Sequence, residues 1–436
     1  MTRSHASEPP YVYRLDPSGS CPHALNAEML ARGAVAEVVL PGDVPGMAVL
    51  GHEALKEFMG HPDVAKNAEH FAALQEGRIP VGWPLTTFAT VPGMVTADGA
   101  EHRRLRSLIG KAFTARQVAA LRPGVERLTA ELLDGMAAAA AAADDAVVDL
   151  RRHFALPLPM SVISELLGVD AEFRDRLHTL STQLVSTDIA PEEAVAANRE
   201  MVAVLGAVAT SRRARPGRDL TSALIASRDD DGSDDGLSDG DGNGGSGGGD
   251  RLTQHELIGT MLVMIVAGHE TTLNLITNAV RALCAHPDQL ELIRTGAADW
   301  ADAVEETLRW DSPVSFFPFR YPTRDVTVDG TVIPRGTPVL AGFSAAGRDT
   351  AAHGPDADRF DVARRSTTRH LSLGHGAHYC LGAPLARMET TIALRQVFTR
   401  FPDLRIAVPE TELARQRSFV GNSVRELPVV LGRSAS

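Results

Sequence analysis

The chain has 436 residues, of which 44% are hydrophobic and 22% charged. This composition is typical of a globular protein with a large core and excludes a wholly disordered or fibrous chain. The formal net charge of -12 is uneven, because residues 229–250 contain eight Asp and no Lys or Arg. No dense block of Lys and Arg occurs, which excludes a nucleic-acid-binding protein. The length alone leaves open whether the chain forms about three domains or one large one.

Cysteine usage and the N-terminal sequence indicate the compartment. The three cysteines, Cys21, Cys284 and Cys380, are too few and too widely spaced for a disulfide framework or a CxxC zinc site. The N-terminal residues contain no apolar run of the kind that a signal peptide needs, and nowhere do about 18 apolar residues follow one another. We therefore expect a soluble cytoplasmic protein without a membrane span.

The first long pattern is helical. Residues 115–213 are Ala-rich, with apolar residues three and four apart, which predicts the body of a mainly α protein. The Ala tract at residues 137–143 is interpreted as the end of a helix. Residues 229–250 are mostly Gly and Asp and are predicted to form a flexible surface loop between two helices. An EF-hand is excluded there, because the ligand pattern that ends in Glu is absent.

A long helix is predicted after this loop. Thr253 and Glu256 form a T-x-x-E capping box, and helical patterning continues to Cys284, just before a His-Pro sequence that ends it. The middle of the helix is almost wholly apolar, so we expect it to run through the centre of the molecule. Residues 268–272 are polar and lie midway along it, where burial of polar groups is costly. We therefore expect these polar residues to have a function that offsets the cost of their burial.

A smaller β region is predicted near the C-terminus. Residues 325–334 and 337–340 alternate β-branched and polar residues around Gly330 and Gly336, as hairpin strands do. Residues 425–431 have the pattern of a further strand. Because strands and helices do not alternate regularly, the sequence predicts a mainly α, α+β fold and not a doubly wound sheet.

The densest group of reactive residues runs from Leu373 to Arg387, a glycine-rich loop that opens a helix. Pro384 suits the first turn of that helix. Cys380 precedes this turn, where unpaired N–H groups and the positive end of the helix dipole stabilise a thiolate. Cys380 is therefore a candidate metal ligand or nucleophile, whereas the other two cysteines are interpreted as small core residues.

Two other chemistries are less favoured by the same residues. His375, His378 and Cys380 could bind zinc, but no fourth ligand is evident, and no oxyanion site supports a Cys-His nucleophile. His269 and Glu270 begin an HExxH zinc-protease motif, but Leu273 stands where the second His should be, so the motif fails.

At this loop the chain resembles the bacterial cytochrome P-450 monooxygenases, whose haem-binding signature is FGxGxHxCxG. The match has one departure, Leu373 in place of Phe. Further matches follow in the order of the family and include residues 102–106, residues 267–272, Glu306 to Arg309, Arg320 and residues 359–361. The resemblance therefore extends from the early helices to the C-terminal region. It is strongest to the actinobacterial branch that acts on natural products.

The resemblance implies a role for each matching residue. Cys380 would be the axial thiolate ligand of the haem iron. Residues expected to contact the haem or its propionates are His102, Arg106, Ala267, Gly268, Arg320, Gly374, His378, Cys380 and Gly382. Glu270 and Thr271 would deliver protons to bound oxygen, and Glu306, Arg309 and Arg359 would form a buried structural network. The substrate pocket is expected to contain Trp83, Leu85, Met264, Val314, Phe316, Phe317 and Phe419.

The resemblance also implies the fold and the reaction. We expect one cytochrome P-450 domain spanning residues 1–436, with a helical part and a smaller β region around a buried haem b. We expect a monomer that inserts one oxygen atom from O2 into an apolar small molecule, such as a steroid, a macrolide or another natural product. Electrons would come from a ferredoxin and its reductase, docking on the thiolate side near Arg103, Arg364, Arg365 and Arg387. Oxidative coupling or C–C bond chemistry on the same fold, and a non-catalytic haem-thiolate protein, remain as alternatives.

Overall fold

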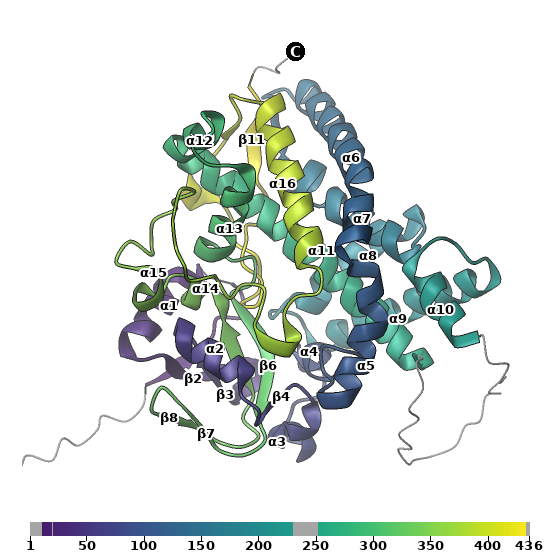
Figure 1. Cartoon of the computed structure of the whole chain (residues 1–436), viewed down its shortest axis with the longest axis vertical. Coiled ribbons are helices and arrows are strands. Elements are labelled where there is room, and N and C mark those ends of the chain that lie inside the picture. Colours follow the sequence, from purple (N-terminus) through teal and green to yellow (C-terminus); the bar gives the residue numbers. More distant parts are fainter. Residues whose placement is uncertain (1–10, 20, 230–251, 433–436) are drawn as a thin grey trace, which may run out of the picture.

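The computed structural model describes residues 11–19, 21–229 and 252–432. Figure 1 shows long helices over most of the molecule, with the large sheet gathered at the lower left. Six strands form this sheet in the order β1-β2-β3-β9-β6-β4. Their bounds are β1 (Val12–Arg14), β2 (Val35–Leu40), β3 (Val44–Val49), β4 (Val64–Ala65), β6 (Phe316–Pro322) and β9 (Val339–Gly342).

Two smaller sheets complete the β structure of the described residues. β7 (Val326–Val328) and β8 (Thr331–Ile333) form an antiparallel hairpin. β11 (Pro428–Val430) pairs antiparallel with both β10 (Arg405–Ile406) and β5 (Val147–Asp149). The strand predicted near the C-terminus is therefore confirmed.

Helices make up most of the remaining described structure. The N-terminal helices are α1 (Pro22–Arg32), α2 (His52–Gly60), α3 (Ala72–Gln75), α4 (Thr86–Thr90) and α5 (Gly99–Gly110). The helical body contains α6 (Ala115–Ala142), α7 (Pro157–Leu167), α8 (Arg174–Val185), α9 (Pro191–Ala214) and α10 (Leu220–Asp229). The remaining helices are α11 (Gln254–Ala285), α12 (Pro287–Arg294), α13 (Trp300–Trp310), α14 (Phe343–Gly347), α15 (Thr350–His353) and α16 (Ala383–Arg400).

α11 is the central helix of the structure. It packs against α7, α8 and α9 and also against α13 and α16. The Thr253 hydroxyl accepts a hydrogen bond from the Glu256 backbone N–H, and the Glu256 carboxylate accepts one from the Thr253 N–H, so the predicted capping box is confirmed. The helix ends at Ala285, before His286 and Pro287. Most of its side chains are buried, as its apolar middle predicted.

The sequence predicted the helices better than the strands. α6 ends at Ala142, within the Ala tract. Residues 325–334 contain the predicted hairpin, but residues 337–340 were wrongly assigned to it, because β9 pairs with β3 and β6 of the large sheet. The flexible loop predicted at residues 229–250 lies outside the described residues apart from Asp229, which ends α10.

Within residues 11–19, 21–229 and 252–432, no helix is both long and apolar enough to cross a bilayer.

Candidate active site

The Cys380 loop turns sharply before it enters α16. Gly374 and Gly376 have φ values of 78° and 72°, a left-handed conformation that glycine adopts without strain. The Cys380 N–H donates to the Leu373 carbonyl oxygen over 2.8 Å, which closes the loop. Pro384 lies in the first turn of α16, as predicted. The thiol is thus held at the N-terminal end of a long helix.

The protonation of Cys380 reflects two opposing effects. Burial raises the pKa of the thiol, while the backbone N–H groups of Gly382 and Ala383 and the charges of Arg106 and Arg387 lower it. Burial has the larger effect, so the start of the helix does not by itself produce the thiolate that we expected from the sequence. Binding of a metal ion to the sulfur would displace the proton.

A cavity of about 250 Å³ lies between the Cys380 loop and α11. Its surface is mainly apolar, with basic side chains among the lining residues. The residues predicted from the sequence that line it are His102, Arg106, Met264, Ala267, Gly268, Thr271, Val314, Phe317, Arg320, Gly374, His378, Cys380 and Gly382. The structure therefore brings residues from α5, α11, β6 and the Cys380 loop to one space.

Most basic side chains of this cavity lack a carboxylate partner among the described residues; His378, with Nε2 3.8 Å from the Asp98 carboxylate, is the exception. Arg320 is 9% exposed and forms no ion pair with a described residue, and burial lowers its pKa to about 10. The rings of His102 and His378 lie 4.1 Å apart, and the buried Nε2 atom of His102 has no hydrogen-bond partner. Buried cations and unpaired donors are costly, so the cavity favours a ligand that carries negative groups.

The residues present fit a haem. Its two propionates are the negative groups that His102, Arg106, Arg320 and His378 require, its flat ring fits the apolar walls, and Cys380 offers sulfur to the iron. The sequence analysis missed a further basic residue, Lys66, which also lines the cavity. Its ammonium donates to the Phe319 carbonyl oxygen over 2.7 Å. A lone lysine after a short strand gave no signal in the sequence.

Thr271 and Gly268 line the cavity from α11. The Thr271 hydroxyl donates to the Ala267 carbonyl oxygen over 2.8 Å, four residues earlier on the same helix. This bond competes with the helical hydrogen bond to that carbonyl and can loosen the helix locally. A Cβ on Gly268 would lie 2.8 Å from the Cγ1 atom of Ile163. The glycine therefore also allows α7 to approach α11, a function that the sequence did not reveal.

Glu270 points to the other side of α11 and does not line the cavity. Its carboxylate accepts a hydrogen bond of 2.9 Å from the Thr182 hydroxyl on α8 and lies 3.3 Å from Nε2 of His269. Burial alone would raise the pKa of Glu270, but His269, His178 and Arg151 together lower it. Glu270 is therefore ionised at neutral pH, and it faces away from its neighbour Thr271.

Four of the predicted pocket residues lie elsewhere. None of them lines the cavity, because each side chain packs in the apolar core around the large sheet. The Trp83 ring stacks on Phe319 at 5.6 Å, and its indole N–H donates to the Pro41 carbonyl oxygen. The corrected residues are Trp83, Leu85, Phe316 and Phe419.

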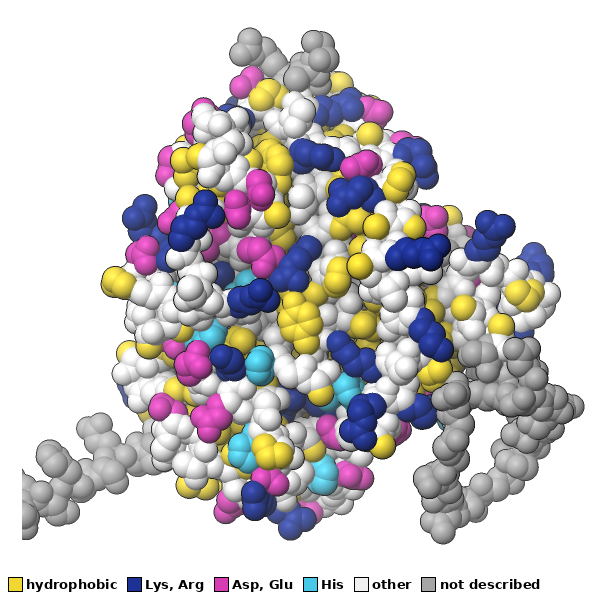
Figure 2. Space-filling view, in the orientation of Figure 1, with side chains coloured by type: hydrophobic (Ala, Val, Ile, Leu, Met, Phe, Trp, Pro, Cys, Tyr) yellow, Lys and Arg dark blue, Asp and Glu magenta, His cyan; other side chains and the backbone are white. Residues whose placement is uncertain are grey.

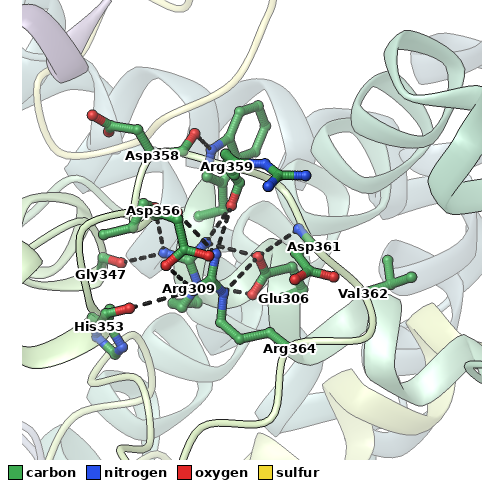
Figure 3. Close-up of polar contacts among 12 residues, drawn as sticks. Glu306, Arg309, Gly347, His353, Asp356, Asp358, Arg359, Asp361, Val362 and Arg364 are labelled. Carbon is green, nitrogen blue, oxygen red and sulfur yellow. Dashed lines mark hydrogen bonds and ion pairs between the residues drawn. The ribbon is translucent and has the colours of Figure 1, made fainter.

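The predicted buried network is built around Glu306 and Arg309 on α13, which form a bidentate ion pair at 2.7 and 2.8 Å (Figure 3). Arg309 also donates to three backbone carbonyl oxygens, those of Gly347, Ala357 and Arg359. Arg359 is exposed and contributes only its backbone carbonyl oxygen to this network. The predicted role of its side chain is therefore wrong. The second arginine beside Glu306 is Arg364, whose side chain is 10% exposed.

The sequence analysis also missed Glu389 on α16. This residue is buried, lines the cavity and has a carboxylate oxygen without a partner. Burial raises its pKa to about 8, so it is mostly protonated at neutral pH. The sequence feature that could have indicated this site is the position of Glu389, nine residues after Cys380 on the helix that follows.

A cysteine that faces the cavity from the start of a helix, basic side chains of which most lack a carboxylate partner, and apolar cavity walls define a haem-thiolate site. Comparison with known proteins agrees with this class. A model of the cytochrome P450 family matches residues 301–415. The chain is 39% identical to 2-hydroxy-5-methyl-1-naphthoate 7-hydroxylase of Streptomyces carzinostaticus, with 97% of this chain and 98% of that protein covered.

Further relatives cover nearly the whole chain. Cytochrome P450 monooxygenase PikC of Streptomyces venezuelae is 37% identical, with 94% of this chain and 90% of that protein covered. The solved structure of CYP154C4 from Streptomyces sp. W2061 is 38% identical and superposes with a TM-score of 0.89, covering 98% of this chain and 99% of that one. The protein belongs to the cytochrome P450 family. It is a haem b monooxygenase with the mainly α fold predicted from the sequence.

The Glu306–Arg309 network generates a stability prediction. Replacing Arg309 by Ala leaves the Glu306 carboxylate and three carbonyl oxygens without their main donor, and we expect a loss of about 3–5 kcal/mol in the free energy of unfolding. Arg359→Ala is the matched control and should cost no more than about 0.5 kcal/mol, because the exposed side chain is removed and the carbonyl remains. Denaturant unfolding of the haem-loaded protein measures both. Equal losses would show that the network does not stabilise the fold.

Proposed function

We propose that this monooxygenase oxidises an uncharged, mainly apolar small molecule in the cavity beside Thr271, with electrons from an acidic ferredoxin in the cytoplasm. The observation that carries the proposal is the distribution of polarity in the cavity. Basic groups gather at the end formed by α5 and β6, where Arg320 lies, while α11 contributes Val263, Met264 and Ala267. With the propionates on the basic groups, an apolar surface is left for the substrate.

The protein residues hold the cofactor and shape its surroundings. Bound haem supplies the iron chemistry that activates O2 for transfer of one oxygen atom. Cys380 provides the sulfur ligand, and His102, Arg106, Arg320 and His378 neutralise the propionates. The surrounding apolar side chains exclude water, which strengthens these charge interactions.

Two side chains of α11 deliver protons to the cavity in this proposal. Glu270 lies on the side of α11 that faces α8, near the half-buried His178, and Thr271 lies on the cavity side. Because the two residues are adjacent, a proton taken up at the Glu270 carboxylate has only a short distance to travel around the helix to the Thr271 hydroxyl. The Thr271 hydroxyl then holds a proton or an ordered water at the cavity wall.

Two relatives support an apolar substrate by their names. One is described as a vitamin D(3) 25-hydroxylase and another as a 6-deoxyerythronolide B hydroxylase. The substrate of this chain would belong to the same broad class.

Thr271 provides the test of proton delivery. Thr271→Ala should retain haem and bind substrate normally, but should divert most reducing equivalents into hydrogen peroxide, because the hydroxyl that holds the proton is lost. Thr271→Ser keeps the hydroxyl and is the matched control, so its coupling should stay near that of the wild type. The ratio of product formed to NAD(P)H consumed is the quantity to measure. Full coupling in Thr271→Ala would contradict the proposed role.

The electron donor is proposed to dock beside the Cys380 loop. Arg103 and Arg365 are exposed, whereas Arg364 is buried in the Glu306 network and cannot contribute to docking as expected from the sequence. Tyr379, next to Cys380, is 40% exposed. Figure 2 shows Lys and Arg side chains spread over the face that carries α6 and α16. Such a surface attracts an acidic partner over several ångströms.

Charge reversal tests this docking surface. The double variant Arg103→Glu, Arg365→Glu should raise the KM for ferredoxin about tenfold or more at low salt, and the difference should shrink as salt screens the charges. Turnover supported by hydrogen peroxide, which needs no electron donor, should not change. Arg213→Glu is the control, because this exposed residue lies on α9, whose main contacts are with α8, α10 and α11. An unchanged KM in the double variant would place the donor elsewhere.

A further inference from the structure

A second constellation of polar side chains lies on the side of α11 that faces away from the cavity. It contains His178 on α8 together with His269 and Glu270 on α11. Nδ1 of His178 lies 3.2 Å from Nε2 of His269 and 3.6 Å from Oε1 of Glu270, and the last two atoms lie 3.3 Å apart. Three ligands of a tetrahedral zinc ion, with bonds of about 2.0 Å, lie about 3.3 Å from one another. The three atoms therefore match one face of a zinc coordination tetrahedron.

The hydrogen bonds around these atoms prepare them as ligands. Nδ1 of His269 bonds with the Ile265 carbonyl oxygen at 2.7 Å, which requires the proton on Nδ1 and leaves a lone pair on Nε2. Metal-bound histidines commonly donate their other ring N–H in this way. The Thr182 hydroxyl donates to Oε1 of Glu270 over 2.9 Å and restrains the carboxylate. His269 and Glu270 are thus fixed before any ion arrives.

An ion can reach this site and would find limited competition. The His178 side chain is 27% exposed, which leaves a path from solvent and room for water as the fourth ligand. The buried cation that acts on Glu270 is Arg151, whose guanidinium donates to Thr277 and Ser423 and forms no ion pair with Glu270. Its positive charge still opposes a second cation, so affinity should fall below that of a structural zinc site.

We propose that His178, His269 and Glu270 bind one Zn²⁺ ion and that the bound ion prevents Glu270 from exchanging protons. Zinc would then inhibit O2 reduction reversibly, from a site separate from the haem. This inference rests on the proposed role of Glu270 for the effect on turnover. Zinc binding itself depends only on the three ligand atoms.

Zinc binding is measured first, on the haem-loaded full chain. Wild-type protein dialysed against micromolar ZnCl2 should retain one more equivalent of zinc than His178→Asn, which loses one of the three ligands. His255→Asn is the matched control, an exposed histidine in the first turn of the same helix, and should bind as the wild type does. Haem content and the carbon monoxide spectrum verify that each variant is folded. Equal zinc content in the wild type and His178→Asn would overturn the site.

Turnover is measured next, with each variant compared with itself without zinc. Zinc at the concentration that saturates the site should slow wild-type and His255→Asn turnover about tenfold or more, since the Glu270 carboxylate can no longer take up and pass on protons, and should leave His178→Asn much less affected. Because all variants use the same ferredoxin and reductase, inhibition of those proteins would slow all three equally. If zinc binds at the site without slowing turnover, the metal site is supported. The proposed inhibition and the proposed role of Glu270 are then both contradicted.

Discussion

One electrostatic constraint organises this structure: basic side chains and a thiol face a single buried cavity to which the described chain contributes one lining carboxylate, that of Glu389. Burial lowers the pKa of Arg320, leaves Nε2 of His102 without a partner and raises the pKa of Glu389. Each of these groups is costly to bury unless a partner is supplied. A bound haem would supply two carboxylates to the bases and an iron to the sulfur, and would so complete the interior electrostatically.

The fold brings these groups together from distant parts of the sequence. β6 carries Arg320, α5 carries His102 and Arg106, and the loop before α16 carries His378 and Cys380. α11 covers the cavity and separates it from the polar cluster that faces α8. Adjacent residues on this helix therefore lie in different surroundings: Thr271 is in the cavity wall, and Glu270 lies beside His178 and His269.

The sequence predicted local features well because they depend on short-range physics. The capping box at Thr253, the proline in the first turn of α16 and the hairpin around Gly330 are each fixed by neighbouring residues. Long-range contacts were harder to predict. Trp83 and Phe419 were assigned to the pocket although they pack beside the sheet, and Arg364 was assigned to the surface although it contacts Glu306. Neither Lys66 nor His178 has a sequence pattern that marks its place in the fold.

The central claim is that Cys380 and the surrounding basic groups hold one haem through its iron and its propionates. The ferrous carbon monoxide spectrum of the purified protein and of Cys380→His tests it most directly, because the position of the Soret band reports whether a thiolate binds the iron. The account predicts the strongly red-shifted band of thiolate ligation in the wild type and its loss in Cys380→His with haem retained. The same red-shifted band in both proteins would contradict it.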